Sequence, residues 1–87
     1  MIERYFCSNK NFTVSTGIIA HKVASNIKVV KDTLWKLEAI EKRGIYTIIF
    51  LSNHRSEIEI GILLEDCKRL FVEIVDSIDD TTKVIAS

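Results

Sequence analysis

Apolar and polar residues alternate near the start of the chain, which is the pattern of β-strands. Residues 2–7 and 12–16 each place every second side chain on the same face. The run Ser8-Asn9-Lys10-Asn11 between them has the composition of a turn. We therefore expect an N-terminal hairpin that ends at Gly17.

After Gly17 the apolar residues follow steps of three and four positions. The members of this series are Ile19, Val23, Ile27, Val30, Leu34 and Leu37. The spacing predicts a long helix over residues 18–43 with one apolar face. Ser15 or Thr16 would cap its start, and Gly44 stands where a left-handed C-terminal cap is expected.

Strands and a second helix are expected in the rest of the chain. Residues 45–51 are β-branched or aromatic and almost continuously apolar, which is typical of a strand buried on both faces. Residues 57–63 alternate strictly and predict a strand, followed by a helix over 65–78 and a short strand over 82–86. As an alternative, Ser56 and Glu59 fit a capping box, which would make residues 57–78 one long helix.

The order of these elements predicts an α+β fold. Hairpin, helix, strand, strand, helix and strand match a two-layer sandwich of ferredoxin-like βαββαβ type with an extra N-terminal strand. If residues 57–78 form one helix, the alternative is a smaller βαβαβ sandwich. With 87 residues, the chain is expected to form a single α+β domain over residues 1–87, near the small end of what folds alone.

Composition indicates a small cytoplasmic protein with a real core. The hydrophobic share is 47%, and the absence of proline argues against linkers. No apolar run is long enough to span a membrane, and the first residues lack the order of a signal peptide. Cys7 and Cys67 lie far apart without a Cys-x-x-Cys motif, so we expect two reduced thiols.

Charge is divided by position along the chain. Residues 1–56 hold nine basic and four acidic side chains, a net charge of +5. Residues 57–87 hold three basic and eight acidic side chains, a net charge of −5. Such polarity bears on association with partners rather than on fold.

Residues for catalysis or metal binding are few. His21 and His54 have no cysteine or carboxylate at ligand spacing, so we expect neither a metal site nor a cofactor. A catalytic or ligand-binding site could be assembled only from Cys67 and His54, and we take this as a minor alternative. The protein is therefore expected not to be an enzyme.

Two surfaces are candidates for binding. On the predicted helix, Trp35 lies at the edge of the apolar face close to Lys28 and Lys31, where it could anchor a protein interface or stack on a base. Trp35 should then contribute less to folding than Phe50 or Phe71. The acidic residues Asp76 and Asp79 form part of a second surface that could dock on a basic partner.

The leading hypothesis is a small non-catalytic regulator or inhibitor that binds another protein, of the kind that mobile elements encode. We expect a homo-oligomer, because the core is small and the strand at residues 58–62 could pair at a sheet edge. A nucleic-acid-binding module that uses a basic helix is the second hypothesis.

Overall fold

The computed structural model describes residues 3–74, which form one antiparallel sheet and one short helix. The elements, in chain order, are β1 (Tyr5–Ser8), β2 (Phe12–Ile19), β3 (Lys22–Val29), β4 (Leu34–Arg43), β5 (Tyr46–Asn53), β6 (Ile58–Leu63), α1 (Leu64–Leu70) and β7 (Phe71–Ile74).

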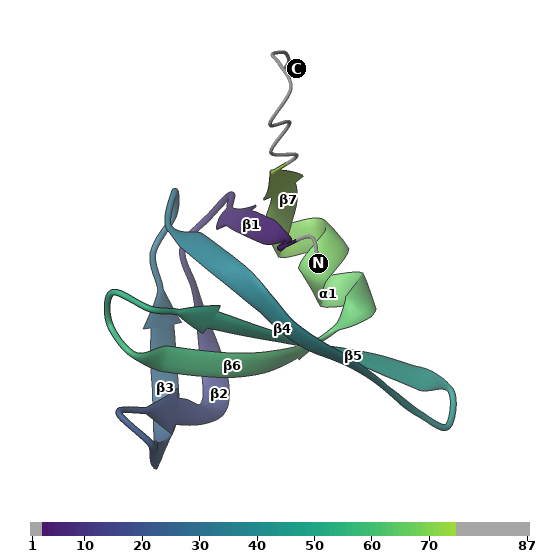
Figure 1. Cartoon of the computed structure of the whole chain (residues 1–87), viewed down its shortest axis with the longest axis horizontal. Coiled ribbons are helices and arrows are strands. Elements are labelled where there is room, and N and C mark those ends of the chain that lie inside the picture. Colours follow the sequence, from purple (N-terminus) through teal and green to yellow (C-terminus); the bar gives the residue numbers. More distant parts are fainter. Residues whose placement is uncertain (1–2, 75–87) are drawn as a thin grey trace.

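The strands follow the order β3-β2-β6-β5-β4-β1-β7 across the sheet, and every neighbouring pair is antiparallel (Figure 1). Consecutive strands form the hairpins β2–β3, β4–β5 and β5–β6. In contrast, β1 lies between β4 and β7, and β2 pairs with β6. Long-range pairing therefore joins the start of the described chain to its end.

The sheet rolls over on itself. Four strands, β6, β5, β4 and β1, lie between β2 and β7 in the sheet order. Nevertheless, the ring of Phe12 in β2 packs edge to face on the ring of Phe71 in β7, with the ring centroids 5.6 Å apart. The two ends of the sheet thus enclose one core, and strong twist of this kind is expected of antiparallel strands.

The core lies on the concave side of the rolled sheet, where α1 also packs through Cys67 and Leu70. Its buried apolar members are Phe6, Ile27, Val29, Trp35, Ile49, Leu51, Ile60, Ile62, Cys67, Leu70 and Phe71. Alternate residues of β5 and β6 enter this core, so their intervening residues occupy the outer, convex face.

Residues 18–43 do not form a helix, and the ferredoxin-like prediction is wrong. This segment contains the end of β2, all of β3 and β4, and the turns between them. The β-branched residues that fill it favour strands. The turns depend on left-handed backbone at Ala20, His21 and Asp32, with φ of 50°, 68° and 67°. Aspartate and histidine adopt this conformation more often than other residues that have a side chain, whereas alanine does not.

The second helix is also shorter than predicted. Residues 58–63 form strand β6, as the main prediction had it, so the alternative of one helix over 57–78 is wrong. The helix ends at Leu70, and β7 follows over Phe71–Ile74. Residues 75–78 of the predicted helix lie outside the described residues. Both predicted sandwiches, βαββαβ and βαβαβ, are therefore wrong. The described residues form a mostly antiparallel sheet with one short helix.

The predicted strands fare better than the helices. The strands expected over 12–16 and 45–51 are present as β2 and β5, each with shifted or extended bounds. β1 overlaps the strand expected over 2–7 and ends one residue beyond it, at Ser8. The N-terminal hairpin is wrong, because β1 pairs with β4 and β7 rather than with β2. The strand expected over 82–86 lies outside the described residues.

Candidate functional site

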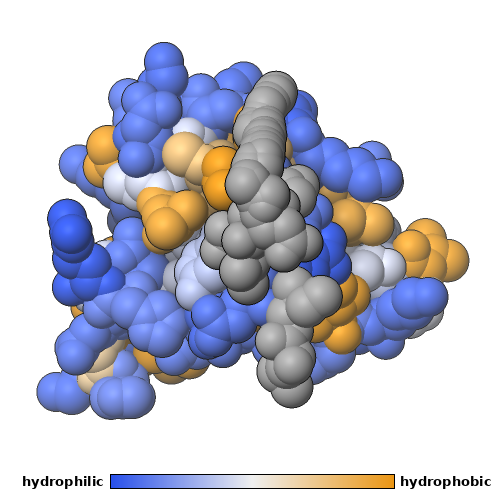
Figure 2. Space-filling model, turned by 45° about the horizontal axis from the view of Figure 1, so that its top comes forward, coloured by the Kyte–Doolittle hydropathy of each residue, from blue (hydrophilic) through white to orange (hydrophobic). Residues whose placement is uncertain are grey.

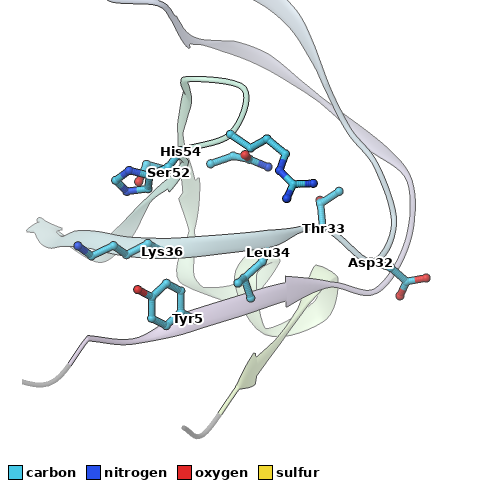
Figure 3. Close-up of a pocket in the computed structure, with 9 residues that line it drawn as sticks. Tyr5, Asp32, Thr33, Leu34, Lys36, Ser52 and His54 are labelled. Carbon is cyan, nitrogen blue, oxygen red and sulfur yellow. The ribbon is translucent and has the colours of Figure 1, made fainter.

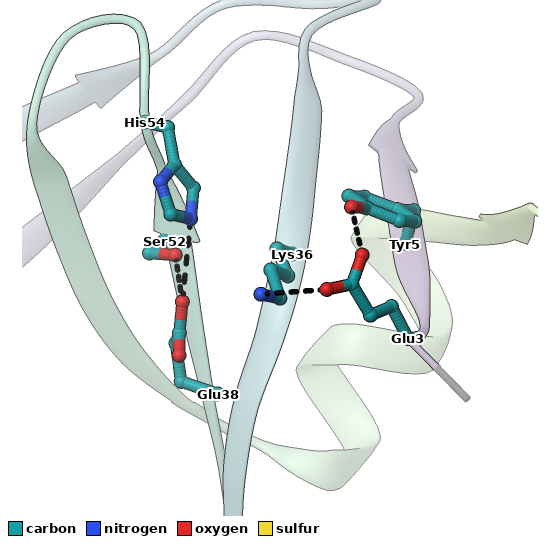
Figure 4. Close-up of polar contacts among 6 residues, drawn as sticks. All are labelled: Glu3, Tyr5, Lys36, Glu38, Ser52 and His54. Carbon is teal, nitrogen blue, oxygen red and sulfur yellow. Dashed lines mark hydrogen bonds and ion pairs between the residues drawn. The ribbon is translucent and has the colours of Figure 1, made fainter. Parts of the chain in front are cut away.

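Polar side chains gather on the outer face of β1, β4 and β5. The register of the sheet places Tyr5 opposite Lys36, and Lys36 opposite Ser52, so these three residues form a row across three strands. We call the group that surrounds this row the polar cluster. Its members are Glu3, Tyr5, Lys36, Glu38, Ser52 and His54 (Figure 4).

One half of the polar cluster is centred on Glu3. The Tyr5 hydroxyl donates a hydrogen bond to Glu3 Oε1 at 2.6 Å, and Lys36 Nζ lies 3.2 Å from Glu3 Oε2. These contacts, that from Tyr5 first, lower the pKa of the Glu3 carboxyl below its ordinary value. The hydrogen bond to Glu3 in turn raises the pKa of Lys36. At neutral pH this half is an ion pair.

The other half is centred on Glu38. The buried Ser52 hydroxyl donates a hydrogen bond to Glu38 Oε2, and His54 Nε2 lies 3.5 Å from the same oxygen. Both groups thus point to one carboxylate oxygen (Figure 4). A serine nucleophile needs its hydroxyl proton directed to a base such as histidine. In this cluster the proton of Ser52 is directed to Glu38 and not to His54.

A hollow of about 480 Å³ lies beside the polar cluster, between the outer face and the β5–β6 turn. Tyr5, Lys36, Ser52 and His54 line one side of it, and the Asp32 side chain points away from them (Figure 3). Most of the lining donors are already bonded within the protein. Arg55 also lines the hollow and makes no ion pair with residues 3–74.

The β4–β5 hairpin projects from the body of the molecule (Figure 1). At its tip the Ile45 side chain is 91% exposed and Tyr46 is 57% exposed. Gly44 has a φ of +61°, which lets the two-residue turn close between Arg43 and Tyr46. Figure 2 shows apolar surface at the end of the molecule where Figure 1 places this hairpin.

The structure separates the residues of the predicted basic stripe. Trp35 is only 2% exposed and packs in the core, so its predicted place at a surface margin is wrong. Its ring lies edge to face against Phe71, with centroids 6.4 Å apart. Lys28 is exposed on the edge strand β3, and Lys31 is exposed in the β3–β4 turn.

The other predicted site residues are not brought together either. Cys67 is buried in α1, where burial, more than the nearby Glu73, raises the pKa of its thiol. His54 is exposed on the outer face, and Cys67 is not among the residues that line the hollow beside it. Asp76 and Asp79 lie outside the described residues.

Sequence reasoning missed the polar cluster because it assigned β4 to a helix. The stretch Trp35-Lys36-Leu37-Glu38 alternates between apolar and polar residues, which is a strand signal. Read as a strand, it would have placed Lys36 and Glu38 on one face. Their partners in β1 and β5 could not have been found, because they depend on the order of strands in the sheet.

Within residues 3–74, no group of three or more histidine, cysteine, aspartate or glutamate side chains could hold a metal ion. The same part of the chain contains no helix with the length and apolar character needed to cross a membrane. No protein-family model matches the chain, and no curated protein or solved structure matches it significantly.

Proposed function

We propose that this protein is a small, non-catalytic, cytoplasmic regulator or inhibitor that acts by binding another protein through the tip of its β4–β5 hairpin. The observation that carries the proposal is the exposure of Ile45, which is 91% exposed at the end of a projecting hairpin. A cytoplasmic setting agrees with Cys7 and Cys67, both of which are free thiols.

An isoleucine in this position contributes little to folding, because its side chain is almost fully exposed to solvent. Burial of such a side chain against a partner would contribute about 1.5–3 kcal/mol. The neighbouring Tyr46 adds an amphipathic ring of the type that is enriched among residues that dominate binding energy. The hairpin thus offers an apolar anchor beside an aromatic one.

A protein partner fits the charges near the tip better than a nucleic acid does. Arg43 is already bonded to Glu41, with its Nε 2.6 Å from Glu41 Oε1. Glu41 would therefore oppose a phosphate backbone close to the arginine. Mixed charge around an apolar centre is instead the usual composition of a protein interface, with its polar rim.

The proposal can be tested by placing a photo-crosslinking amino acid at position 45 and, as a matched control, at the exposed position 10. In cells of the native host, position 45 should give a discrete adduct that protease removes and nuclease does not. The crosslinked protein, once identified by mass spectrometry and purified, should bind the unmodified chain in a calorimeter.

Substitution then connects binding to the hairpin. Ile45→Ser should weaken the calorimetric affinity by about tenfold or more, whereas Lys10→Ser should leave it nearly unchanged. Identical adducts at positions 45 and 10, or an adduct removed by nuclease alone, would contradict the proposal.

A further inference from the structure

β3 forms one edge of the sheet and is paired on one side only. Its single neighbour is β2, so its other side faces no strand of residues 3–74 (Figure 1). A free edge presents backbone N–H and C=O groups that can pair with another chain. The edge pairing expected at residues 58–62 does not have this opportunity, because β6 lies between β2 and β5.

The free backbone groups of β3 can be assigned near the β2–β3 turn. This turn has two residues, both with positive φ, and is closed by the pair Ile19–Lys22. In such a hairpin the closing pair exchanges hydrogen bonds, and the following pairs alternate between non-bonded and bonded. Val23 and Ser25 belong to non-bonded pairs, so their N–H and C=O groups point away from β2. Asn26, with a φ of 53°, ends this regular stretch, so an added strand would pair with the first half of β3.

An apolar hollow reaches this edge from the outer face of the sheet. Val23, which is 80% exposed, lines it together with Ile18 and Phe50, and its volume is about 430 Å³. When a strand is added to a sheet, its backbone supplies the hydrogen bonds and its alternate side chains enter pockets beside the edge. The hollow next to Val23 can accept such a side chain.

The region around the free edge is positively charged. Residues 12–31 contain Lys22, Lys28 and Lys31 and no aspartate or glutamate. All three lysines are exposed, and none makes an ion pair with residues 3–74. They oppose pairing with a second copy, because the same lysines would approach from the other side. They favour a segment of negative charge.

We propose that the free edge of β3 binds an extended, acidic segment of a partner protein, which adds an eighth strand to the seven-stranded sheet. The segment bonds through its backbone to Val23 and Ser25, and one of its apolar side chains enters the hollow. Its aspartate or glutamate side chains lie near the lysines of β3. This site is separate from the hairpin tip, since β2 and β6 lie between β3 and the β4–β5 hairpin in the sheet order.

An acidic peptide fits this edge better than a nucleic acid does. A phosphate backbone would contact the lysines, but it would leave the backbone groups of Val23 and Ser25 without partners and the apolar hollow unfilled. A peptide in the extended conformation satisfies the backbone groups, the hollow and the charge together.

The test begins with a selection from a displayed library of short random peptides, with the folded chain as bait. Enriched peptides should alternate apolar residues with aspartate or glutamate. A bait with Lys22→Glu and Lys28→Glu should lose them. The matched control with Lys42→Glu and Lys68→Glu, which changes the net charge equally on exposed lysines of β4 and α1, should keep them. An Ile45→Ser bait should also keep them, which separates this site from the hairpin tip.

One enriched peptide is then synthesised, and its dissociation constant is measured by calorimetry. Lys22→Glu with Lys28→Glu should raise this constant by about tenfold or more. N-methylation of the peptide amides that face β3 should weaken binding by a similar factor, because it removes their hydrogens. In the wild-type complex, hydrogen exchange of the Val23 and Ser25 amides should slow by about tenfold or more.

Circular dichroism confirms that each variant is folded. The proposal would be overturned by enrichment of basic or uncharged peptides, or by equal affinity of the N-methylated and unmodified peptides. A duplex oligonucleotide that binds the same lysines more tightly than the selected peptide would assign the edge to nucleic acid. Self-association of the wild-type chain that Lys22→Glu abolishes would assign it to a second copy.

Discussion

Trp35 donates its indole N–H to Thr33 Oγ1 at 2.9 Å, and this bond satisfies the one polar atom of a side chain that is otherwise buried among apolar residues. Thr33 Oγ1 also donates to the carbonyl oxygen of Val30 at 2.6 Å. The bond therefore ties the largest core side chain to the β3–β4 turn. A buried tryptophan held in this way specifies how the turn packs on the core.

Trp35→Ala should consequently be among the most damaging single substitutions, with a loss of about 3–5 kcal/mol in the free energy of unfolding. Phe50→Ala should cost less, because Phe50 lies half-buried on the outer face. Urea denaturation of the two variants gives the comparison. Equal urea midpoints for the two variants, or a lower midpoint for Phe50→Ala, would contradict the role of Trp35 in the core.

Ser8 should matter more for stability than its size suggests. Its side chain is buried, and its Oγ accepts the backbone N–H of Thr33 at 3.0 Å and lies 2.6 Å from the carbonyl oxygen of Val30. Ser8→Ala leaves the part-buried N–H of Thr33 without this partner, whereas the carbonyl of Val30 keeps the bond from Thr33 Oγ1, and the free energy of unfolding should fall by about 1–3 kcal/mol. The exposed Ser25→Ala serves as the control, and thermal denaturation should show almost no change for it.

Stability should fall in acid because of the Arg4–Glu73 pair, whose Nε and Oε2 atoms lie 2.6 Å apart. The hydrogen bond from Arg4 lowers the pKa of the Glu73 carboxyl below its ordinary 4.5. A depressed pKa in the folded state means that the contribution is present above pH 4.5 and is lost as the pH falls through the lower, folded-state value.

Glu73→Gln should therefore reduce the difference in melting temperature between pH 7 and pH 3 relative to the wild type, since the substituted side chain does not titrate. Glu65→Gln, on an exposed part of α1, is the control. An unchanged acid dependence in Glu73→Gln would show that other carboxyl groups dominate.

Substitution by alanine should destabilise the protein for different reasons at Gly61 and at Gly44. Gly61→Ala brings a Cβ atom within 2.8 Å of Phe50 Cε1, whereas the same change at Gly44 meets no atom within 4 Å but forces alanine to a φ of +61°. Each change should lower the free energy of unfolding by about 1–2 kcal/mol, Gly61→Ala through crowding and Gly44→Ala through backbone strain.

A double-mutant cycle separates the two causes. Phe50→Leu removes the atoms that crowd position 61, so Gly61→Ala should become less costly in this background. The cost of Gly44→Ala should stay the same. Equal costs of Gly61→Ala in both backgrounds would mean that the ring does not determine the need for glycine.

Cys67 should react more slowly than Cys7 with a thiol reagent at mildly alkaline pH. Cys67 is buried and its thiol pKa is raised by that burial, whereas Cys7 is only partly buried. Single Cys→Ser variants assign the two rates. A faster reaction at Cys67 than at Cys7 would contradict this prediction and support a nucleophilic role for Cys67.

The sequence predicted the strands better than it predicted the connections between them. β2, β5 and β6 follow from clear alternation or β-branched runs, which are local properties. The false helix arose because spacings of three and four can arise by chance across strands and turns. Val23, Val30 and Leu34, which were assigned to its apolar face, are 80%, 58% and 54% exposed.

The candidate surfaces were even less predictable from sequence, for a physical reason. The hairpin tip needs only Gly44 and its neighbours, but its importance depends on how far it projects from the body. The polar cluster joins Tyr5, Lys36 and Ser52, which become neighbours only when β1, β4 and β5 are adjacent in the sheet. No periodicity within a single segment contains that information.

The position of β1 also determines when the molecule can be completed during synthesis. Both partners of β1, the strands β4 and β7, follow it in the chain, and Arg4 meets Glu73 across 69 positions. Contacts of such long sequence separation slow folding, whereas local hairpins such as β4–β5 form early. During synthesis, β1 must therefore keep one edge unpaired until residues 71–74 have been made, and an unpaired strand edge is prone to aggregation.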